Sequence, residues 1–176
     1  AGVKRAAAVA VDPKTGGVLA LVSFPSFDNN LFSQGITQEQ WDKLSKDKNM
    51  PFLNRVIAGK YATGSTIKPL IAAAGLNEGI IDENTTINCK GEIIVENPWN
   101  KNEPYIFKDI SAHGITDVRK AIAQSCNVFF YTIGGGYKNF KGLGPENIKK
   151  YLELFGWGAK LGIDLPGEVK GFIRDK

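Results

Sequence analysis

The sequence predicts an α+β protein in which helices pack on an antiparallel sheet. Two short apolar runs near the start, residues 6–11 and 18–23, suit buried strands, and a segment of turn-forming residues separates them. This is the pattern of a β-hairpin. Segments with the apolar period of helices follow the hairpin and do not alternate with strands. That order favours an antiparallel sheet with segregated helices over a parallel sheet.

Composition excludes several classes of protein. The 176 residues are 43% hydrophobic and 23% charged, which is ordinary for one globular domain with its own core. The net charge of +4 is spread along the chain without a basic run, so nucleic acid is not an expected partner. We find no apolar run of membrane-spanning length and no signal peptide. Because a predicted strand lies close to each end, we expect a piece of a longer protein.

The first third of the chain is a hairpin followed by short irregular segments. The hairpin turn spans residues 12–17 and is rich in Asp, Pro and Gly. Residues 24–30 are predicted to form a loop, and residues 38–45 a short helix that contains Trp41 and Leu44. Residues 47–51 end this helix, and residues 52–61 connect it to the next one.

A central helix is predicted from about Ser65 to Asn77, with Gly79 as its C-terminal cap. Its buried face carries apolar residues at steps of three and four: Ile67, Leu70, Ile71 and Ala74. Ser65 lies at the positive end of the helix dipole, and Lys68 follows one turn later on the same side. A hydroxyl and an amine placed in this way can form a nucleophile and its base. The alternative is a capping serine and an incidental surface lysine.

The second half has weaker signals. Residues 80–115 form a long excursion with one strand-like run at 92–95. A helix capped by Thr116 is predicted to extend to residue 122, and a second helical run at 128–133 ends at three glycines, residues 134–136. A third helix follows Pro145 over residues 146–155, with its apolar face on Ile148, Leu152 and Phe155. Residues 161–165 and 171–173 read as strands.

Two motifs in the same order identify a family. Ser65-Thr66-Ile67-Lys68 has the form S-x-x-K, and Ser125-Cys126-Asn127 has the form S-x-N. Further matching stretches flank them: residues 12–20, 25–28, 54–55, 64–69, 113–114, 128–130 and 162–168. The chain resembles the class B penicillin-binding proteins over nearly its whole length, and most of all the penicillin-binding protein 2 type of the elongation machinery of rod-shaped bacteria. The resemblance implies the transpeptidase fold shared with β-lactamases.

Two departures from the family pattern stand out. Thr63 occupies a position where the family usually has proline, which we expect to be tolerated. The family's third motif, K-T-G, follows S-x-N on a strand that lines the cleft, whereas Lys14-Thr15-Gly16 precedes the serine and lies in the hairpin turn. We therefore interpret Lys14-Thr15-Gly16 as a turn, and expect the true motif either beyond residue 176 or lost. Residues 1–176 are then the N-terminal part of a single transpeptidase domain.

The resemblance implies acyl transfer on D-alanyl-D-alanine stem peptides of peptidoglycan, with no cofactor for the chemistry. Ser65 would be the nucleophile and the residue that β-lactams acylate. Lys68 would be its base once the pKa of the amine is lowered, and Ser125 would relay a proton to the leaving amine. Asn127 would hold Lys68 and a substrate amide, and the Ser65 N–H would be one oxyanion donor. For Ser125 and Asn127 the alternative role is helix capping.

The resemblance also implies a location and partners. A class B enzyme would act at the periplasmic face of the bacterial inner membrane, with an anchor outside this piece of chain. Its expected partners are the glycosyltransferase RodA and the scaffold protein MreC. Two other functions stay open: a β-lactam-hydrolysing or -sensing protein of the same fold, and a non-catalytic scaffold of the elongation complex.

A second group of residues has the chemistry of a metal site. The only histidine and both cysteines fall between residues 89 and 126, and with one aspartate they make a four-ligand set suited to tetrahedral zinc: Cys89, Asp109, His113 and Cys126. The resemblance implies the same, because some penicillin-binding protein 2 relatives carry zinc at positions that match the acidic residue, the histidine and the neighbour of the S-x-N motif. The alternatives are a disulfide between the two cysteines, and two buried free thiols beside a core histidine.

Overall fold

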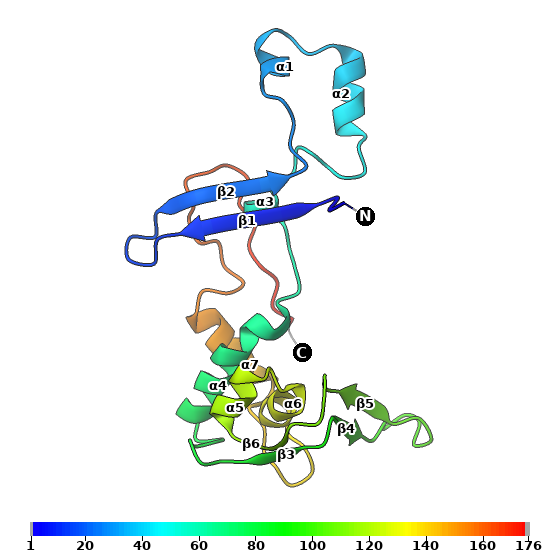
Figure 1. The fold of residues 1–176 in the computed structure, drawn as a ribbon, viewed down its shortest axis with the longest axis vertical. Coiled ribbons are helices and arrows are strands. Elements are labelled where there is room, and N and C mark those ends of the chain that lie inside the picture. The colour runs from blue at the N-terminus through cyan, green and yellow to red at the C-terminus, as the bar shows by residue number, and fades with distance from the viewer. Residues whose placement is uncertain (1, 175–176) are drawn as a thin grey trace. The chain divides into compact units, whose positions relative to one another are not determined.

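The computed structural model describes residues 2–174, which form two compact units (Figure 1). One unit contains residues up to 61 together with 160–171, and the other contains residues 62–159 together with the segment from 172. The first unit holds β1 (Ala6–Val11), β2 (Val18–Phe24), α1 (Asn30–Ser33), α2 (Gln38–Ser45) and α3 (Arg55–Ala58). The second holds η1 (Gly64–Ile67), α4 (Lys68–Asn77), β3 (Ile87–Cys89), β4 (Glu92–Val95), β5 (Tyr105–Lys108), β6 (Gly114–Thr116), α5 (Val118–Ala123), α6 (Asn127–Gly135) and α7 (Gly144–Leu154).

The predicted hairpin is confirmed. β1 and β2 pair antiparallel from Ala6 opposite Phe24 to Val11 opposite Val18. The turn is organised by Asp12, whose carboxylate accepts hydrogen bonds from the Lys14 N–H and the Thr15 hydroxyl, each at 2.9 Å. The Lys14-Thr15-Gly16 sequence therefore forms a turn, as predicted.

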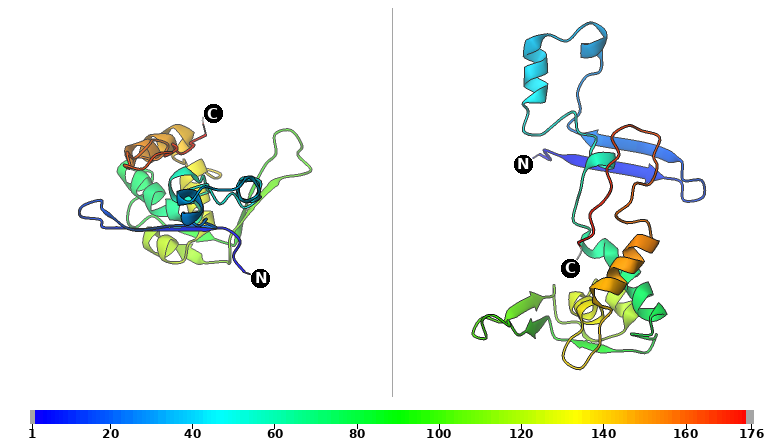
Figure 2. Two further views of the ribbon diagram at one scale, coloured as in Figure 1. Left: turned by 90° about the horizontal axis from the view of Figure 1, so that it is seen from above. Right: turned by 180° about the vertical axis from the view of Figure 1, so that it is seen from behind.

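The strands of this hairpin are not buried, contrary to the prediction. All six residues of β1 are exposed, and Leu19 of β2 is 74% exposed. The described strands pair only in twos, as β1–β2, β3–β6 and β4–β5, so they form three small antiparallel sheets (Figures 1 and 2). The four-residue helix α3 contacts both β1 and β2, but it is too short to cover a face of the hairpin. The α+β class is confirmed, but one sheet covered by helices is not formed among residues 2–174.

Short helices follow the hairpin in the first unit. α2 has the predicted bounds, and Thr37 caps it in a capping box with Gln40. The predicted strands at 161–165 and 171–173 are wrong, because that part of the chain is irregular. The Glu168 carboxylate accepts hydrogen bonds from the N–H groups of Leu161 and Gly162, so these donors need no strand partner.

The core lies in the second unit, around α6. α6 packs against α4, α5 and α7 (Figures 1 and 2). Phe129 and Ile133 of α6 are completely buried. Burial of a phenylalanine side chain contributes roughly 1.5–3 kcal/mol relative to exposure. α6 is thus the element on which the unit is assembled.

The predicted central helix has two parts. Its first turn is the 3-10 helix η1, and the α-helical part, α4, starts at Lys68. Gly79 follows the α4 cap with a φ of +66°, and its N–H donates to Leu76 O. The Ile80 N–H donates to Gly75 O, which completes a Schellman motif. The prediction for Gly79 is confirmed.

The excursion between residues 80 and 115 contains more structure than predicted. Of its four strands only β4 was expected, because β3 and β6 have three residues each and are too short to show a period. The predicted Thr116 cap is wrong, since Thr116 lies in β6. Asp117 caps α5 by accepting a hydrogen bond from the Lys120 N–H at 2.8 Å.

The last helix agrees with the prediction except at its end. Leu152 is buried and Ile148 packs against the core, but Phe155 is exposed because α7 ends at Leu154. Over residues 2–174 we observe no helix whose length and apolar character would let it cross a membrane.

Candidate active site

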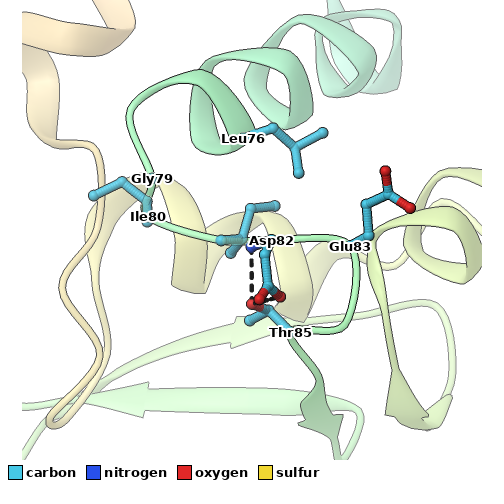
Figure 3. Close-up of a pocket in the computed structure, with 7 residues that line it drawn as sticks. Leu76, Gly79, Ile80, Asp82, Glu83 and Thr85 are labelled. Atoms are coloured by element: carbon cyan, nitrogen blue, oxygen red, sulfur yellow. Dashed lines mark hydrogen bonds between the residues drawn. The ribbon is translucent and has the colours of Figure 1, made fainter.

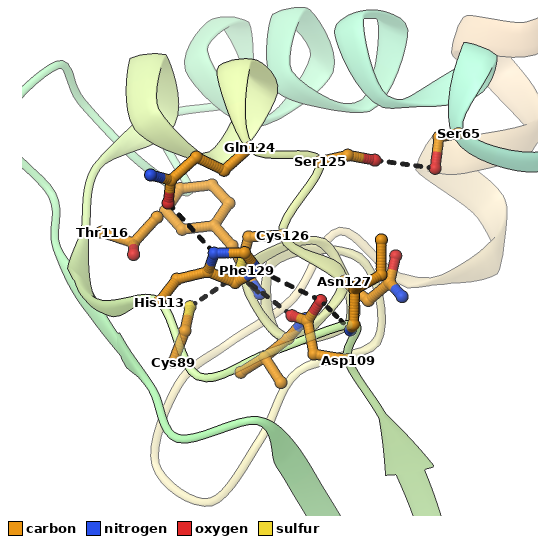
Figure 4. A network of polar contacts seen from close by, with 12 residues as sticks. Ser65, Cys89, Asp109, His113, Thr116, Gln124, Ser125, Cys126, Asn127 and Phe129 are labelled. Carbon is orange, nitrogen blue, oxygen red and sulfur yellow. Dashed lines mark hydrogen bonds and ion pairs between the residues drawn. The ribbon is translucent and has the colours of Figure 1, made fainter.

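Four polar residues predicted from the two motifs converge in the second unit. Ser65 lies in η1 and Lys68 begins α4. Ser125 lies in the loop between α5 and α6, and Asn127 begins α6. Figure 4 shows Ser65 and Ser125 facing each other across this junction. Residues separated by about sixty positions in the sequence therefore share one polar cluster.

Lys68 is held by three oxygen atoms. Its Nζ donates to Ser125 O at 2.6 Å, Ser125 Oγ at 3.0 Å and Asn127 Oδ1 at 2.6 Å. Because an ammonium group has three N–H donors, this arrangement is that of charged lysine. The residue is only 8% exposed. Burial lowers the pKa of Lys68 and outweighs the opposite effect of the charges on Asp109 and Cys126.

Ser125 connects Lys68 to Ser65. The Ser125 hydroxyl donates to Ser65 Oγ at 2.9 Å and accepts from Lys68 Nζ. Once Lys68 is neutral, both bonds can reverse, and a proton leaving Ser65 then has a path of two short hydrogen bonds to the amine. The 3-10 turn that carries Ser65 has no side-chain cap, so Ser65 does not serve as a helix cap.

An unusual backbone conformation sets the position of Ser125. Its φ is +54°, in the left-handed region that favours glycine. The Ser125 N–H donates to Ile122 O and the Cys126 N–H donates to Ala121 O, so α5 ends in a Schellman motif with serine where glycine is usual. The conformation costs roughly 1–2 kcal/mol for a residue with a side chain. It directs the hydroxyl towards Ser65 and Lys68.

Neither Ser125 nor Asn127 caps α6. The N-cap residue is Cys126, whose Sγ accepts from the Phe129 N–H at 3.4 Å. The Asn127 side chain instead contacts Lys68, and the Ser125 side chain contacts both Lys68 and Ser65. The capping alternative for these two residues is therefore not what the structure shows.

The predicted metal ligands also lie close together. The ligand atoms of Asp109, His113 and Cys126 are all within 4.8 Å of one another. Cys89 does not complete this mutual cluster, but its Sγ lies 2.8 Å from Cys126 Sγ. Both cysteines are buried free thiols, so the disulfide alternative is not formed. Burial raises the pKa of the Cys126 thiol, and its contact with Cys89 adds to this.

Asp109 joins this cluster to the start of α6. Its carboxylate accepts hydrogen bonds from the N–H groups of Val128 and Ile110, each at 2.8 Å. Burial would raise the pKa of Asp109, but these bonds and one from the Asn127 N–H outweigh it and bring the pKa to about 2. The carboxylate is therefore charged at neutral pH.

Sequence analysis missed Gln124, which orients the histidine. Gln124 Oε1 lies 3.0 Å from His113 Nδ1 (Figure 4). The amide oxygen can only accept, so Nδ1 is the donor of this bond, and the other ring nitrogen, Nε2, lies 3.4 Å from Asp109 Oδ1. One sulfur, one imidazole nitrogen and one carboxylate oxygen thus lie close to one another, and this donor set suits zinc. The only sequence signal for Gln124 was its position next to the S-x-N motif.

One cavity of the second unit is separate from these clusters. It has a volume of about 460 Å³ and lies beside the C-terminal end of α4 (Figure 3). Leu76, Ile80 and Asp82 contribute to its lining, and no residue of the polar cluster or of the metal cluster does. This cavity therefore does not mark the position of either cluster.

Comparison with known proteins agrees with the motifs and the geometry. The family model "Penicillin binding protein transpeptidase domain" matches residues 6–176. The peptidoglycan D,D-transpeptidases MrdA of Acinetobacter baumannii and Escherichia coli are 39% and 37% identical over 96% and 95% of this chain. These matches cover 24% and 25% of the relatives, so the chain spans about a quarter of their length.

Solved structures give the same result. The complex between penicillin-binding protein PBP2 and MreC from Helicobacter pylori superposes with a TM-score of 0.84 at 34% identity, covering 98% of this chain and 30% of that one. Pseudomonas aeruginosa PBP2 in complex with WCK 5153 gives 0.82 at 32% identity, covering 97% and 37%. The chain belongs to the penicillin-binding protein transpeptidase domain family.

Proposed function

We propose that this chain supplies the nucleophile half of a D,D-transpeptidase that cross-links D-alanyl-D-alanine stem peptides of peptidoglycan. The observation that carries the proposal is the continuous contact from Ser65 Oγ through Ser125 Oγ to Lys68 Nζ, at 2.9 and 3.0 Å. A nucleophile, a bridging hydroxyl and an amine within hydrogen-bond reach meet the geometric requirement for acyl transfer. MrdA relatives are named peptidoglycan D,D-transpeptidases, which supports this substrate class.

The reaction starts when Lys68 loses its proton, which the lowered pKa favours. The Ser65 hydroxyl then passes its proton towards Lys68 through Ser125, and Ser65 Oγ attacks the carbonyl of the penultimate D-alanine. Ser65 lies in the first turn of η1, where backbone N–H groups lack partners within the helix, so its N–H is available to the oxyanion. Ser125 returns the proton to the nitrogen of the leaving D-alanine as the peptide bond breaks. The amine of a second stem peptide then attacks the seryl ester and forms the new amide, the ester bond to Ser65 breaks, and the proton that the amine loses returns to Ser65 Oγ through Ser125.

We further propose that residues 1–176 are the N-terminal part of one transpeptidase domain, whose K-T-G strand lies on the rest of the protein. No K-T-G follows Ser125 in the sequence, and the chain covers a quarter of its relatives. The exposed apolar residues of β1 and β2 fit a hairpin that other strands cover in the complete protein. Residues 1–176 by themselves are expected to react with β-lactams slowly or not at all.

The test is covalent labelling of the full-length protein by a fluorescent penicillin. Ser65 should be labelled, and Ser65→Ala should lose the label entirely. Ser26→Ala is a matched control at a serine outside the site and should be labelled normally. Labelling that persists in Ser65→Ala, or rapid labelling of residues 1–176 alone, would contradict the proposal.

Two other functions predict different outcomes. In a β-lactam-hydrolysing protein the acyl-enzyme turns over in water, whereas a transpeptidase holds it, so the release rate of the labelled product separates the two. A non-catalytic scaffold would still support cell elongation as the Ser65→Ala variant. If cells whose only copy of the protein is the Ser65→Ala variant still grow as rods, that result would favour the scaffold.

The relatives also suggest the setting of the reaction. The H. pylori PBP2 structure is a complex with MreC, and we propose MreC and the glycosyltransferase RodA as partners of the full-length protein. We propose the periplasmic face of the inner membrane as its location. Co-purification of full-length protein with each partner from membranes is the measurement, and a protein that stays in the cytoplasmic fraction would contradict the location.

We also propose a structural zinc ion held by Asp109, His113 and Cys126, with Cys89 as the fourth ligand. The donor set supports it, and so does the orientation of His113 by Gln124. Zinc would take no part in acyl transfer. It would link β3 and the residues after β5 to the start of α6. Cys126 lies between Ser125 and Asn127, so this link would hold both side chains that contact Lys68.

Zinc is tested by elemental analysis of full-length protein purified without chelator. About one zinc per protein is expected, and His113→Ala should lose most of it. His113 is the only histidine of this chain, so this substitution removes its single imidazole ligand. Wild-type protein without metal would contradict the proposal.

A further inference from the structure

Lys68 contacts one aromatic ring in addition to its three oxygen acceptors. Lys68 Nζ lies over the face of Phe130, 5.5 Å from the ring centroid. This is within the distance at which an ammonium group is attracted to an aromatic face. Phe130 is 7% exposed, so the contact is made away from solvent. The amine therefore contacts three oxygen acceptors and one π-face.

The position of Phe130 on α6 explains the contact. Phe130 follows Asn127 by three residues, so both side chains lie on the same face of the helix. Phe130 packs edge-on against the completely buried ring of Phe129, with centroids 5.5 Å apart. The ring is thereby held in orientation. α6 presents one polar and one aromatic contact to the same amine.

We propose that Phe130 is a positioning residue for Lys68, whose ring face stabilises the protonated amine that forms when Ser65 gives up its proton. This rests on the proposed role of Ser65 and Lys68. The ring acts on the charged form of the amine only, because a neutral amine has no cation–π attraction. Phe130 would thus raise the basicity of Lys68 in a site where burial lowers it.

Other charged groups near Lys68 do not replace this effect. Asp109, whose carboxylate is hydrogen-bonded to the start of α6, is the charged group that acts on Lys68; Cys126, the N-cap residue of α6, adds to this effect only as a thiolate. α5 and α7 also pack against α4, but their lysines are engaged elsewhere. Lys120 donates to backbone oxygens of His113 and Ile115, and Lys150 pairs with Glu78. A metal ion at Asp109 and Cys126 would also act on the charge of Lys68. The Phe130 variants and the wild-type protein are therefore compared at equal zinc content.

The experiment compares Phe130→Leu with Phe130→Tyr in the full-length protein. Leucine keeps apolar bulk and loses the ring, whereas tyrosine keeps the ring. The rate of Ser65 labelling by a fluorescent penicillin is measured from pH 5 to pH 10. We expect the midpoint of the rising limb to move down by ~0.4–1.5 pH units in Phe130→Leu and to stay in place in Phe130→Tyr. The plateau rate of Phe130→Leu should also fall, because a weaker base accepts the proton less readily.

A purely structural role would lower the plateau without moving the midpoint, and that result would overturn the proposal. If Phe130→Leu does not fold, 3,5-difluorophenylalanine at position 130 keeps the ring shape and weakens its π-face. It should move the midpoint in the same direction, and an unchanged midpoint would again overturn the proposal. Wild-type protein that is not labelled at Ser65 would instead refute the proposed function, so the two failures are distinct.

Discussion

The two units of the chain place their apolar side chains differently. In the second unit, helices surround α6 and bury Phe129 and Ile133 completely. In the first unit, apolar residues of β1 and β2 such as Val9 and Leu19 are exposed. Both regions are rich in apolar residues, so burial depends on the number of layers that a segment can join. The four residues of the polar cluster all lie in the unit that supplies its own core.

Removing the amine of Lys68 should have the largest effect on the chemistry of that unit. Lys68→Met keeps the length of the side chain and leaves three acceptors without a donor. We expect Ser65 labelling in the full-length protein to fall by roughly 10²–10⁴-fold, the usual size of a general-base contribution. In wild-type protein the rate should be lost as the pH falls through the folded pKa, which lies below the ordinary lysine value. A loss of less than tenfold would contradict the role of Lys68.

A pair of truncations tests the contrast in burial directly. Phe129→Ala should lower the free energy of unfolding by about 3–5 kcal/mol, because it opens a cavity in the core. Leu19→Ala in the same 176-residue chain should change it by less than about 0.5 kcal/mol. Denaturant titration of both variants gives the comparison. A cost above 1.5 kcal/mol for Leu19→Ala in the full-length protein would show that the hairpin is covered there.

The charge of Asp109 should contribute stability that depends on pH. Its folded pKa of about 2 lies below the ordinary value of 3.8, so the stabilisation is complete above pH 3.8 and is lost as the pH falls through 2. The difference corresponds to about 2 kcal/mol. Asp109→Asn keeps an oxygen acceptor for the Val128 N–H and removes the titration. The free energy of unfolding of the metal-free protein, measured between pH 5 and pH 2, should therefore change less with pH in this variant than in wild type. An equal change in both proteins would contradict the stabilising role of the Asp109 charge.

The smallest effect concerns the backbone at Ser125. Ser125→Gly should be more stable than Ser125→Ala by about 1 kcal/mol, because glycine adopts a positive φ without steric cost. Both variants lack the hydroxyl, so both should be labelled far more slowly than wild type. Thermal unfolding of the two variants measures the difference. Equal stability would show that the left-handed conformation is not strained.

Sequence patterns identified several features correctly, and each has a local cause. The hairpin of β1 and β2, the bounds of α2 and the Gly79 cap follow from turn residues, capping residues and apolar period. The two short motifs also named the residues of the polar cluster, because spacing and residue type carry the chemistry of the site.

Only the tertiary structure decided which segments are buried and how distant residues meet. The exposure of β1, the 3-10 turn before Lys68 and the three-residue strands β3 and β6 have no distinct local signal. Ser125 in a left-handed conformation, Gln124 beside His113 and Phe130 beside Lys68 depend on how α4, α5 and α6 pack. The sequence by itself determined which groups can react. Packing determined the distances between them, because those distances join residues about sixty positions apart.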